Sequence, residues 1–297
     1  MFSTFWALQI IFTKFGFNAG AQVFPFLLIS TIFAFLILVV LIFPKVKSEF
    51  INLYAKQKSQ FWKLYAANGI QAGFGTCLAL IGISLTNAIN AGFLVKLTTV
   101  TTILFAWILL KERMSWIKVA VVLLMLTGAY LLTTQAQVLI PQPGDLFLLA
   151  ACVCWSLGTV LVRFFLRDRP IDPDVVTMQK PMASLPVILV LISVIAIVPF
   201  SFGELTQVFD CCQLGSSGIL YSLVNGTCMA MAWIYLYRTL KVSTASYLTM
   251  MSMITPVMVS IMAVIFLGET LVWIQLIGAA LIILSGILVY FSDIAYA

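Results

Sequence analysis

The chain carries little charge and no histidine. Charged residues make up 9% of its 297 residues, whereas soluble domains carry about 25%. Hydrophobic residues make up 63%. A soluble core cannot bury this much apolar surface, so lipid must be the solvent for most of the chain. No polar stretch is long enough to form a second, soluble domain. These absences predict an integral membrane protein.

The sequence also lacks the residue pattern of a metal centre. Its cysteines show no metal-ligand spacing and support no structural disulfide (Cys77, Cys152, Cys154, Cys211, Cys212 and Cys228). We therefore expect no metal and no other cofactor. A net charge of +6 would suit nucleic-acid binding in a soluble protein, but here the basic residues occupy short loops between apolar runs. They indicate membrane topology, and no nucleic-acid partner is expected.

The apolar runs have the length of transmembrane helices. A span needs roughly 20 residues. These runs are too long and continuous for barrel strands, and an open sheet cannot exist in lipid. The predicted fold is therefore all-α and integral to the membrane. Ten transmembrane helices are expected, at residues 1–16, 24–43, 63–84, 90–110, 117–134, 145–166, 175–199, 216–238, 244–267 and 271–291.

The basic residues occupy every second loop and therefore one side of this arrangement. The loops and span ends after spans two, four, six and eight hold 13 of the 16 Lys and Arg residues, and the loops after the odd-numbered spans hold none. Positively charged loops stay in the cytoplasm, so both termini are predicted to be cytoplasmic. The plasma (inner) membrane is the favoured location, and an organelle membrane is the alternative. No pattern indicates an oligomeric state.

The two halves of the chain resemble each other. The segment Phe5-Trp6-Ala7-Leu8 matches Cys154-Trp155-Ser156-Leu157 at an offset of 149, and Asn68-Gly69 matches Asn225-Gly226 at an offset of 157. Glu112 to Ile117 matches Glu269 to Ile274, again at 157. The repeats are expected at 1–134 and 145–291. Because each contains five spans, an odd number, they insert in opposite orientations, an arrangement typical of secondary transporters.

The first span is shorter than its repeat mate. About ten residues of its own span precede Trp155, but five residues precede Trp6. Three explanations stay open: a misassigned start site, a sequence that begins late, or a tilted span in a thinned bilayer.

Three features together resemble the drug/metabolite transporter superfamily, EamA type. They are the spacing from Trp6 to Lys14, the run Thr255-Pro256-Val257 followed by Leu267-Gly268-Glu269-Thr270-Leu271, and Gly278-Ala279-Ala280 to Gly286. The resemblance covers essentially the whole chain. It implies five-plus-five helices, a central cavity between the halves, and export or exchange of metabolites such as amino acids. The first repeat departs from the pattern, with Thr99 where the second has Pro256, and Lys96 at a usually apolar position.

Lys96 is the leading candidate for substrate binding. It lies six residues into its span, roughly 9 Å below the helix end, and no carboxylate lies in the middle of any span. A charge at that depth costs about 2.5–3.5 kcal/mol and is expected to face a polar cavity. Thr99 follows at helical spacing and extends a polar stripe. Snorkelling to the outer surface is the alternative for Lys96, and Lys14, nearer a span end, is balanced between the two roles.

Other residues are weaker candidates. Lys180 precedes two prolines, Pro181 and Pro186, that can break span seven, and its amine is expected to reach the cytoplasmic interface. Amides bind substrate or, more commonly, other helices, and Trp and Tyr near span ends usually form interfacial belts. The remaining substrate-binding candidates are Asn68, Gln71, Asn225, Trp155 and Tyr237.

The sequence as a whole predicts a secondary transporter of a small polar or anionic metabolite, such as an amino acid, working by alternating access. A nucleotide-sugar or phosphorylated-metabolite exchanger is the alternative within transport. A membrane-embedded enzyme is disfavoured, because the chain has no catalytic triad, nucleotide loop or mid-membrane acid. With no such acid, facilitated exchange and coupling through lysine deprotonation both stay open. The expected partners are a small-molecule substrate and the lipid bilayer. Glu112 and Glu269, at span ends, are expected to act as caps or gates.

Overall fold

The computed structural model describes residues 1–113, 115–167, 170–197, 215–268 and 270–294, and this part of the chain folds into helices joined by short connections. The elements are α1 (Phe2–Asn18), α2 (Val23–Leu41), α3 (Phe43–Lys56), α4 (Lys58–Asn68), η1 (Gly69–Phe74), α5 (Gly75–Ser84), α6 (Ala88–Leu94), η2 (Val95–Leu97), α7 (Thr98–Leu110), α8 (Trp116–Thr134), α9 (Pro143–Leu166), α10 (Pro173–Ile197), α12 (Ser216–Val242), α13 (Ala245–Ser252), α14 (Thr255–Leu267) and α15 (Trp273–Ile294).

The described residues contain nine helical segments long and apolar enough to cross a membrane. They begin with α2 and end with α15, and three of them consist of two or three consecutive elements. The remaining apolar helix, α1, is 17 residues long. The chain is therefore a multi-pass integral membrane protein.

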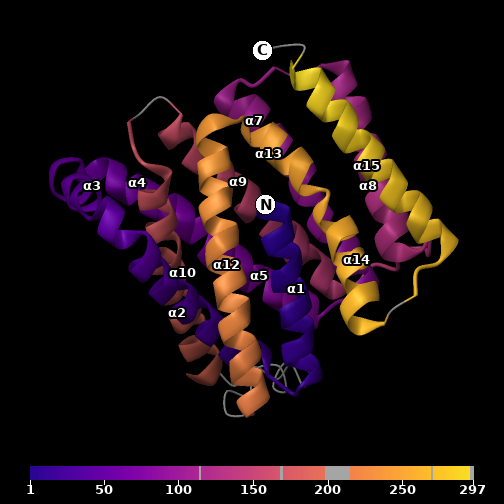
Figure 1. The fold of residues 1–297 in the computed structure, drawn as a ribbon, viewed down its shortest axis with the longest axis horizontal. Coiled ribbons are helices and arrows are strands. Elements are labelled where there is room, and N and C mark those ends of the chain that lie inside the picture. Colours follow the sequence, from indigo (N-terminus) through magenta and orange to yellow (C-terminus); the bar gives the residue numbers. More distant parts are fainter. Residues whose placement is uncertain (114, 168–169, 198–214, 269, 295–297) are drawn as a thin grey trace.

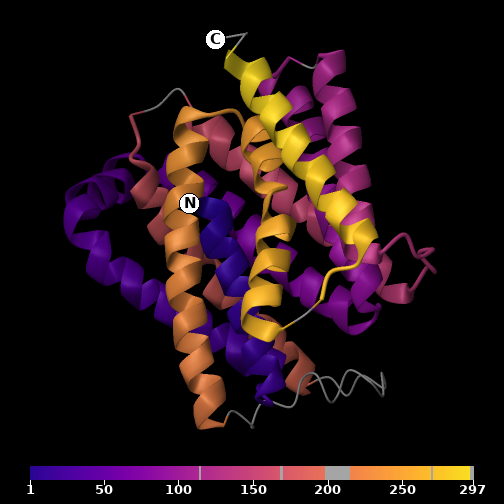
Figure 2. The ribbon, with the colours of Figure 1, turned by 45° about the vertical axis from the view of Figure 1, so that its right-hand side comes forward.

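The helices form a bundle in which segments from the two halves of the chain interleave (Figure 1). The N-terminal helix α1 packs against α12 and α14, from the second half, and α12 also packs against α2. Helices α8 and α15 lie side by side at one edge, and α3 and α4 lie at the opposite edge, as Figure 2 also shows. The last helices of the two predicted repeats are thus neighbours.

Backbone-to-backbone contact joins α8 to α15. A Cβ atom added to Gly128 would lie 2.8 Å from the carbonyl oxygen of Gly278, and one added to Gly278 would lie 2.6 Å from that of Gly128. Both distances are too short for any real Cβ contact. Small residues of this kind allow the close approach on which helix association in lipid depends.

Three of the predicted uninterrupted spans contain local breaks. The π-helix η1 interrupts the span of α4 and α5, and the 3₁₀ turn η2 separates α6 from α7. A turn at Met253 and Ile254 separates α13 from α14. With the repeat offset of 157, Lys96 and Leu97 of η2 correspond to Met253 and Ile254, so the breaks occupy equivalent positions. Proline at the start of α14 accounts for the second break, since Pro256 cannot donate a helical hydrogen bond.

The suggestion that prolines break span seven is wrong. Helix α10 continues through Pro181 and Pro186. Pro186 has no N–H to donate to the carbonyl of Met182, four residues earlier, and the hydroxyl of Tyr65 donates to that carbonyl instead, at 2.7 Å. The hydroxyl of Ser184 donates to the carbonyl of Pro181 at 3.3 Å. A hydroxyl from a neighbouring helix thus replaces the bond that Pro186 removes.

The connection after the second span is also different from the prediction. It was expected to be a basic loop, but residues Phe43–Lys56 form helix α3. Val46 and Leu53 lie seven residues apart on one face and are buried, which gives α3 a side to pack on the bundle.

Candidate functional site

A cavity of about 350 Å³ lies inside the bundle. Both halves of the chain line it, and among the described spans only α8 and α15 contribute no residue. Its polar or charged lining residues are Gln9, Thr31, Gln71, Thr76, Lys96, Thr98, Thr99, Thr159, Lys180, Ser184, Thr249, Ser252 and Thr255. The described lining contains two lysines and no carboxylate, so the cavity carries positive charge.

Lys180 is the most deeply buried charge of the cavity. Its residue is 4% exposed, and its Nζ donates to Oε1 of Gln71 at 3.1 Å. The same Nζ lies 5.3 Å from the ring centroid of Trp233 and 5.2 Å from that of Tyr237, within range of cation–π attraction. The expectation that this amine reaches the cytoplasmic interface is therefore wrong. The position of Lys180 near the end of its predicted span would have allowed its amine to reach the interface. In the structure the side chain points to Gln71 instead.

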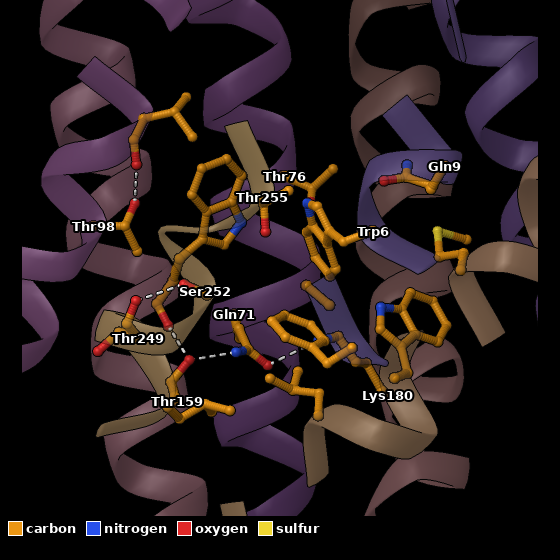
Figure 3. Close-up of a pocket in the computed structure, with 18 of the residues that line it drawn as sticks. Trp6, Gln9, Gln71, Thr76, Thr98, Thr159, Lys180, Thr249, Ser252 and Thr255 are labelled. Carbon is orange, nitrogen blue, oxygen red and sulfur yellow. Dashed lines mark hydrogen bonds between the residues drawn. The ribbon is translucent and has the colours of Figure 1, made fainter. Parts of the chain in front are cut away.

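Gln71 of η1 connects Lys180 to Thr159 of α9, as Figure 3 shows, and to Tyr237 of α12. Its Nε2 donates to Oγ1 of Thr159 at 2.5 Å, and its Oε1 also accepts from the hydroxyl of Tyr237 at 2.9 Å. Tyr237 additionally hydrogen-bonds Oδ1 of Asn68. This network holds the amide so that its oxygen faces the amine. Lysine has three donors, and Lys180 uses one on a described residue, which leaves two for a solute.

Lys96 lies beside the starts of two half-helices. It belongs to η2, directly before α7, and it lines the cavity together with Thr98 and Thr99 of α7 and Thr255 of α14. The chain runs through η2 into α7 with helical backbone angles, and the N–H of Thr98 donates to the carbonyl of Val95. The change from 3₁₀ to α geometry therefore lies beside the cavity, and Lys96 places a full charge there.

Aromatic rings supply much of the apolar wall. Phe2 and Trp6 of α1, Trp155 of α9 and Trp233 of α12 all line the cavity. Figure 3 shows Trp6 and Lys180 on the same side of the pocket, with Thr159 and Thr249 across from them. The cavity therefore offers both cationic and apolar contacts to a solute.

The structure divides the predicted binding residues into two groups. Lys96, Thr99, Gln71 and Trp155 line the cavity. Four others, Lys14, Asn68, Asn225 and Tyr237, are not in its lining.

The four residues outside the lining have other surroundings, and their role in substrate binding stays a prediction. Lys14 is exposed on the surface of α1. Asn225 donates to the carbonyl of Gln9 at 2.8 Å and to Oγ1 of Thr13 at 2.7 Å, so it joins α12 to α1. Asn68 and Tyr237 are fully buried and support Gln71 from behind. In lipid, an amide or hydroxyl that faces a neighbouring helix is used first to bind it.

Sequence reasoning missed several lining residues. Lys180 was placed at the interface, and Trp6 and Trp233 were not among the predicted binding residues, because Trp near a span end usually forms an interfacial belt. One signal existed: Lys180 is followed by two prolines, and no acid can neutralise it within its span. An intramembrane cation of this kind is by default a candidate site residue.

One end of the bundle is held by a set of polar contacts. The carboxylate of Glu112, just after α7, accepts from the backbone N–H of Ala245 at 2.9 Å and from Oγ of Ser246 at 2.5 Å, which caps α13. The guanidinium of Arg163 donates to the carbonyl of Lys241 at 2.7 Å. Arg238 forms an ion pair with Asp174 at 2.7 Å. The first contact ties the end of α7 to α13, and the other two tie α12 to α9 and α10. The repeat mate of Glu112, Glu269, lies outside the described residues.

The fold and the charged central cavity are those of a multi-pass membrane transporter, and the comparisons with known proteins name its family. The model of the EamA-like transporter family matches residues 1–134 and again 142–291, so the chain belongs to this family.

A curated relative and a solved structure are also similar to the chain. The relative, the uncharacterized transporter YyaM of Bacillus subtilis (strain 168), is 26% identical over 224 residues, covering 73% of this chain and 69% of that protein. The solved structure, titled only as the crystal structure of a protein, has a TM-score of 0.73 and 20% identity, and the match covers 97% of this chain and 95% of that one. At that identity the structure supports the fold alone.

Proposed function

We propose that this protein is a secondary transporter that exports or exchanges a small metabolite with an anionic group, by alternating access. One observation carries the proposal: two lysines face one cavity whose described lining contains no carboxylate. An anion or a zwitterion such as an amino acid neutralises that charge. In a medium of low dielectric the attraction is stronger than in water.

The lining residues divide into two roles in this proposal. Lys180 and Lys96 bind the anionic group, with Gln71 orienting Lys180 through their 3.1 Å hydrogen bond. The rings of Trp6, Trp155 and Trp233 pack against the less polar part of the solute. A cavity of about 350 Å³ suits a small molecule.

The proposed framework is ten transmembrane helices in two inverted five-helix repeats, at 1–134 and 145–291, with α1 as the tenth span. Two observations support it. The breaks before α7 and α14 are repeat mates, and the fifth helices of the two repeats, α8 and α15, pack on each other. We place the protein in the plasma membrane with both termini in the cytoplasm. The end of α7 then also faces the cytoplasm, so the contacts around Glu112 close the cytoplasmic end of the cavity. Rocking of the repeats would open it.

A phosphorylated-metabolite or nucleotide-sugar exchanger is the second candidate. The presence of two lysines rather than one favours it, because a phosphate carries more charge than a carboxylate. The cavity volume favours the smaller solute. Metabolite profiling of cells with and without the protein separates the two candidates, since the exported solute should change in abundance.

Cysteine labelling tests the inverted arrangement. Single cysteines placed at Lys56 and at Lys241 should react with an impermeant reagent only from the cytoplasm, and cysteines within 201–214, outside the described residues, only from the other side. The expected side of each reaction follows from the positively charged loops, which stay in the cytoplasm. Labelling of all three positions from the same side would exclude the inverted repeat.

A further inference from the structure

Helix α3 has one face on the bundle and one face away from it. Its 14 residues connect α2 to α4. Val46 and Leu53 are each 4% exposed, and Phe50 packs beside them in the same apolar cluster. Helix α3 packs against α2, α4 and α10, at the edge of the bundle opposite α8 and α15 (Figure 1). The other face of α3 has no partner among the described residues.

Four exposed lysines flank this free face: Lys45, Lys47 and Lys56 on α3, and Lys58 at the start of α4. We call them the basic patch. Within the described residues none of the four ammonium groups makes a hydrogen bond or an ion pair. The carboxylate of α3, Glu49, accepts the backbone N–H of Asp172 at 2.6 Å and so is held against the bundle. The positive charge of the basic patch is therefore left uncompensated.

Apolar side chains lie exposed next to the basic patch. Ile51 is 50% exposed, Tyr54 is 51% exposed and Trp62 of α4 is 54% exposed. The rings of Tyr54 and Trp62 both pack edge-on against the ring of Phe61, at centroid distances of 5.2 and 5.6 Å. Trp and Tyr are enriched at the level of lipid headgroups. A helix with an apolar edge beside lysines is suited to lie in that layer.

We propose that the basic patch binds the headgroups of anionic phospholipids in the cytoplasmic leaflet, with α3 lying along the membrane surface. Topology alone requires positive charge in this connection, but it requires neither a folded helix nor exposed aromatic residues beside the charge. Lysine stems can lie along the apolar edge while their amines reach the phosphates. Cations that bind phosphate, next to aromatic rings that favour the headgroup layer, identify an anionic phospholipid as the ligand of the basic patch. The inference is independent of which solute the cavity takes.

Lipid selectivity of the purified, full-length protein tests this. The protein is reconstituted in mixed phosphatidylglycerol and phosphatidylcholine, and its association with spin-labelled forms of each lipid is measured. We expect wild type to prefer phosphatidylglycerol. Changing all four lysines of the patch to Gln should reduce that preference at least about fivefold, the effect expected from one lysine at an anionic surface. The matched variant with four Lys→Arg changes should keep it.

Equal association of wild type with the two lipids would overturn the proposal, and so would a Lys→Gln variant with wild-type selectivity. If the Gln variant fails to insert, as checked by size-exclusion profile, a salt titration of wild type decides. Raising the salt from about 0.1 M to about 1 M shortens the screening length from about 10 Å to about 3 Å, and the preference should fall. A preference unaffected by salt would contradict a headgroup site at these lysines.

Discussion

Lys180→Met is expected to lower transport of the physiological solute by about ten- to a hundredfold. A hydrogen bond to a charged group contributes about 1.5–3 kcal/mol, which corresponds to that range. Lys180 is 4% exposed in a cavity whose described lining holds no carboxylate, so the solute is its natural counter-ion. Initial rates of uptake into proteoliposomes measure the effect.

The same variant should fold at least as stably as wild type. Methionine has nearly the length of the lysine stem, and the change removes the cost of burying a charge that no carboxylate offsets. Gln71 keeps its contacts with Tyr237 and Thr159. Thermal unfolding in detergent checks this. A Lys180→Met protein that transports normally would show that Lys180 does not bind the solute. Loss of transport together with a lower unfolding temperature would show that Lys180 stabilises the bundle instead.

Lys14→Met is the matched control for this experiment. Lys14 is also a lysine within an apolar helix, but it is exposed and lies outside the cavity lining. We expect wild-type transport from it. A loss equal to that of Lys180→Met would mean that any intramembrane lysine matters, and the assignment of the cavity would lose its support.

Lys96→Met is expected to reduce transport about tenfold or more while expression and insertion stay normal. Met253 occupies the equivalent place at the other half-helix break, so the packing should tolerate methionine. The lost interaction is again one charged contact, of about 1.5–3 kcal/mol. Reconstituted Lys96→Met with wild-type rate and affinity would show that Lys96 merely snorkels to the surface.

The double variant tells whether the two lysines share one anionic group. If both contact the same carboxylate, the effects are coupled, and the double variant should lose less than the product of the single losses. If they bind separate groups, as a solute with two anionic groups would require, the losses should multiply. This comparison uses the same uptake assay.

Hydropathy predicted most of the membrane helices, because the need to satisfy every backbone group in lipid leaves few alternatives for an apolar run. It could not predict the break at η2. Pro256 signals the equivalent break before α14, but the first repeat has Thr99 there, and the intramembrane charge of Lys96 was the sole local sign. Helix α3 was missed because its lysines suggested a loop, although Val46, Phe50 and Leu53 follow a helical period.

The sequence predicted a polar cavity within the membrane, but not which residues line it. An unpaired lysine in a span indicates a polar cavity, and Lys96 lies in one. Which way a side chain faces depends on how the helices pack, and the sequence of one helix does not contain that information. Lys180 lies near a predicted span end yet points inward to Gln71, whereas Asn225, an equally good candidate by residue type, binds Gln9 and Thr13.

The central claim is that the cavity selects solutes by negative charge. Counterflow into proteoliposomes measures this most directly, with pairs of solutes that differ only in a carboxylate or its uncharged amide, starting from the metabolite that profiling identifies. The cavity with Lys180 and Lys96 predicts that the carboxylate exchanges at least about tenfold faster than its amide, the value of one charge-assisted contact. Equal exchange of acid and amide, or faster exchange of the amide, would contradict the account.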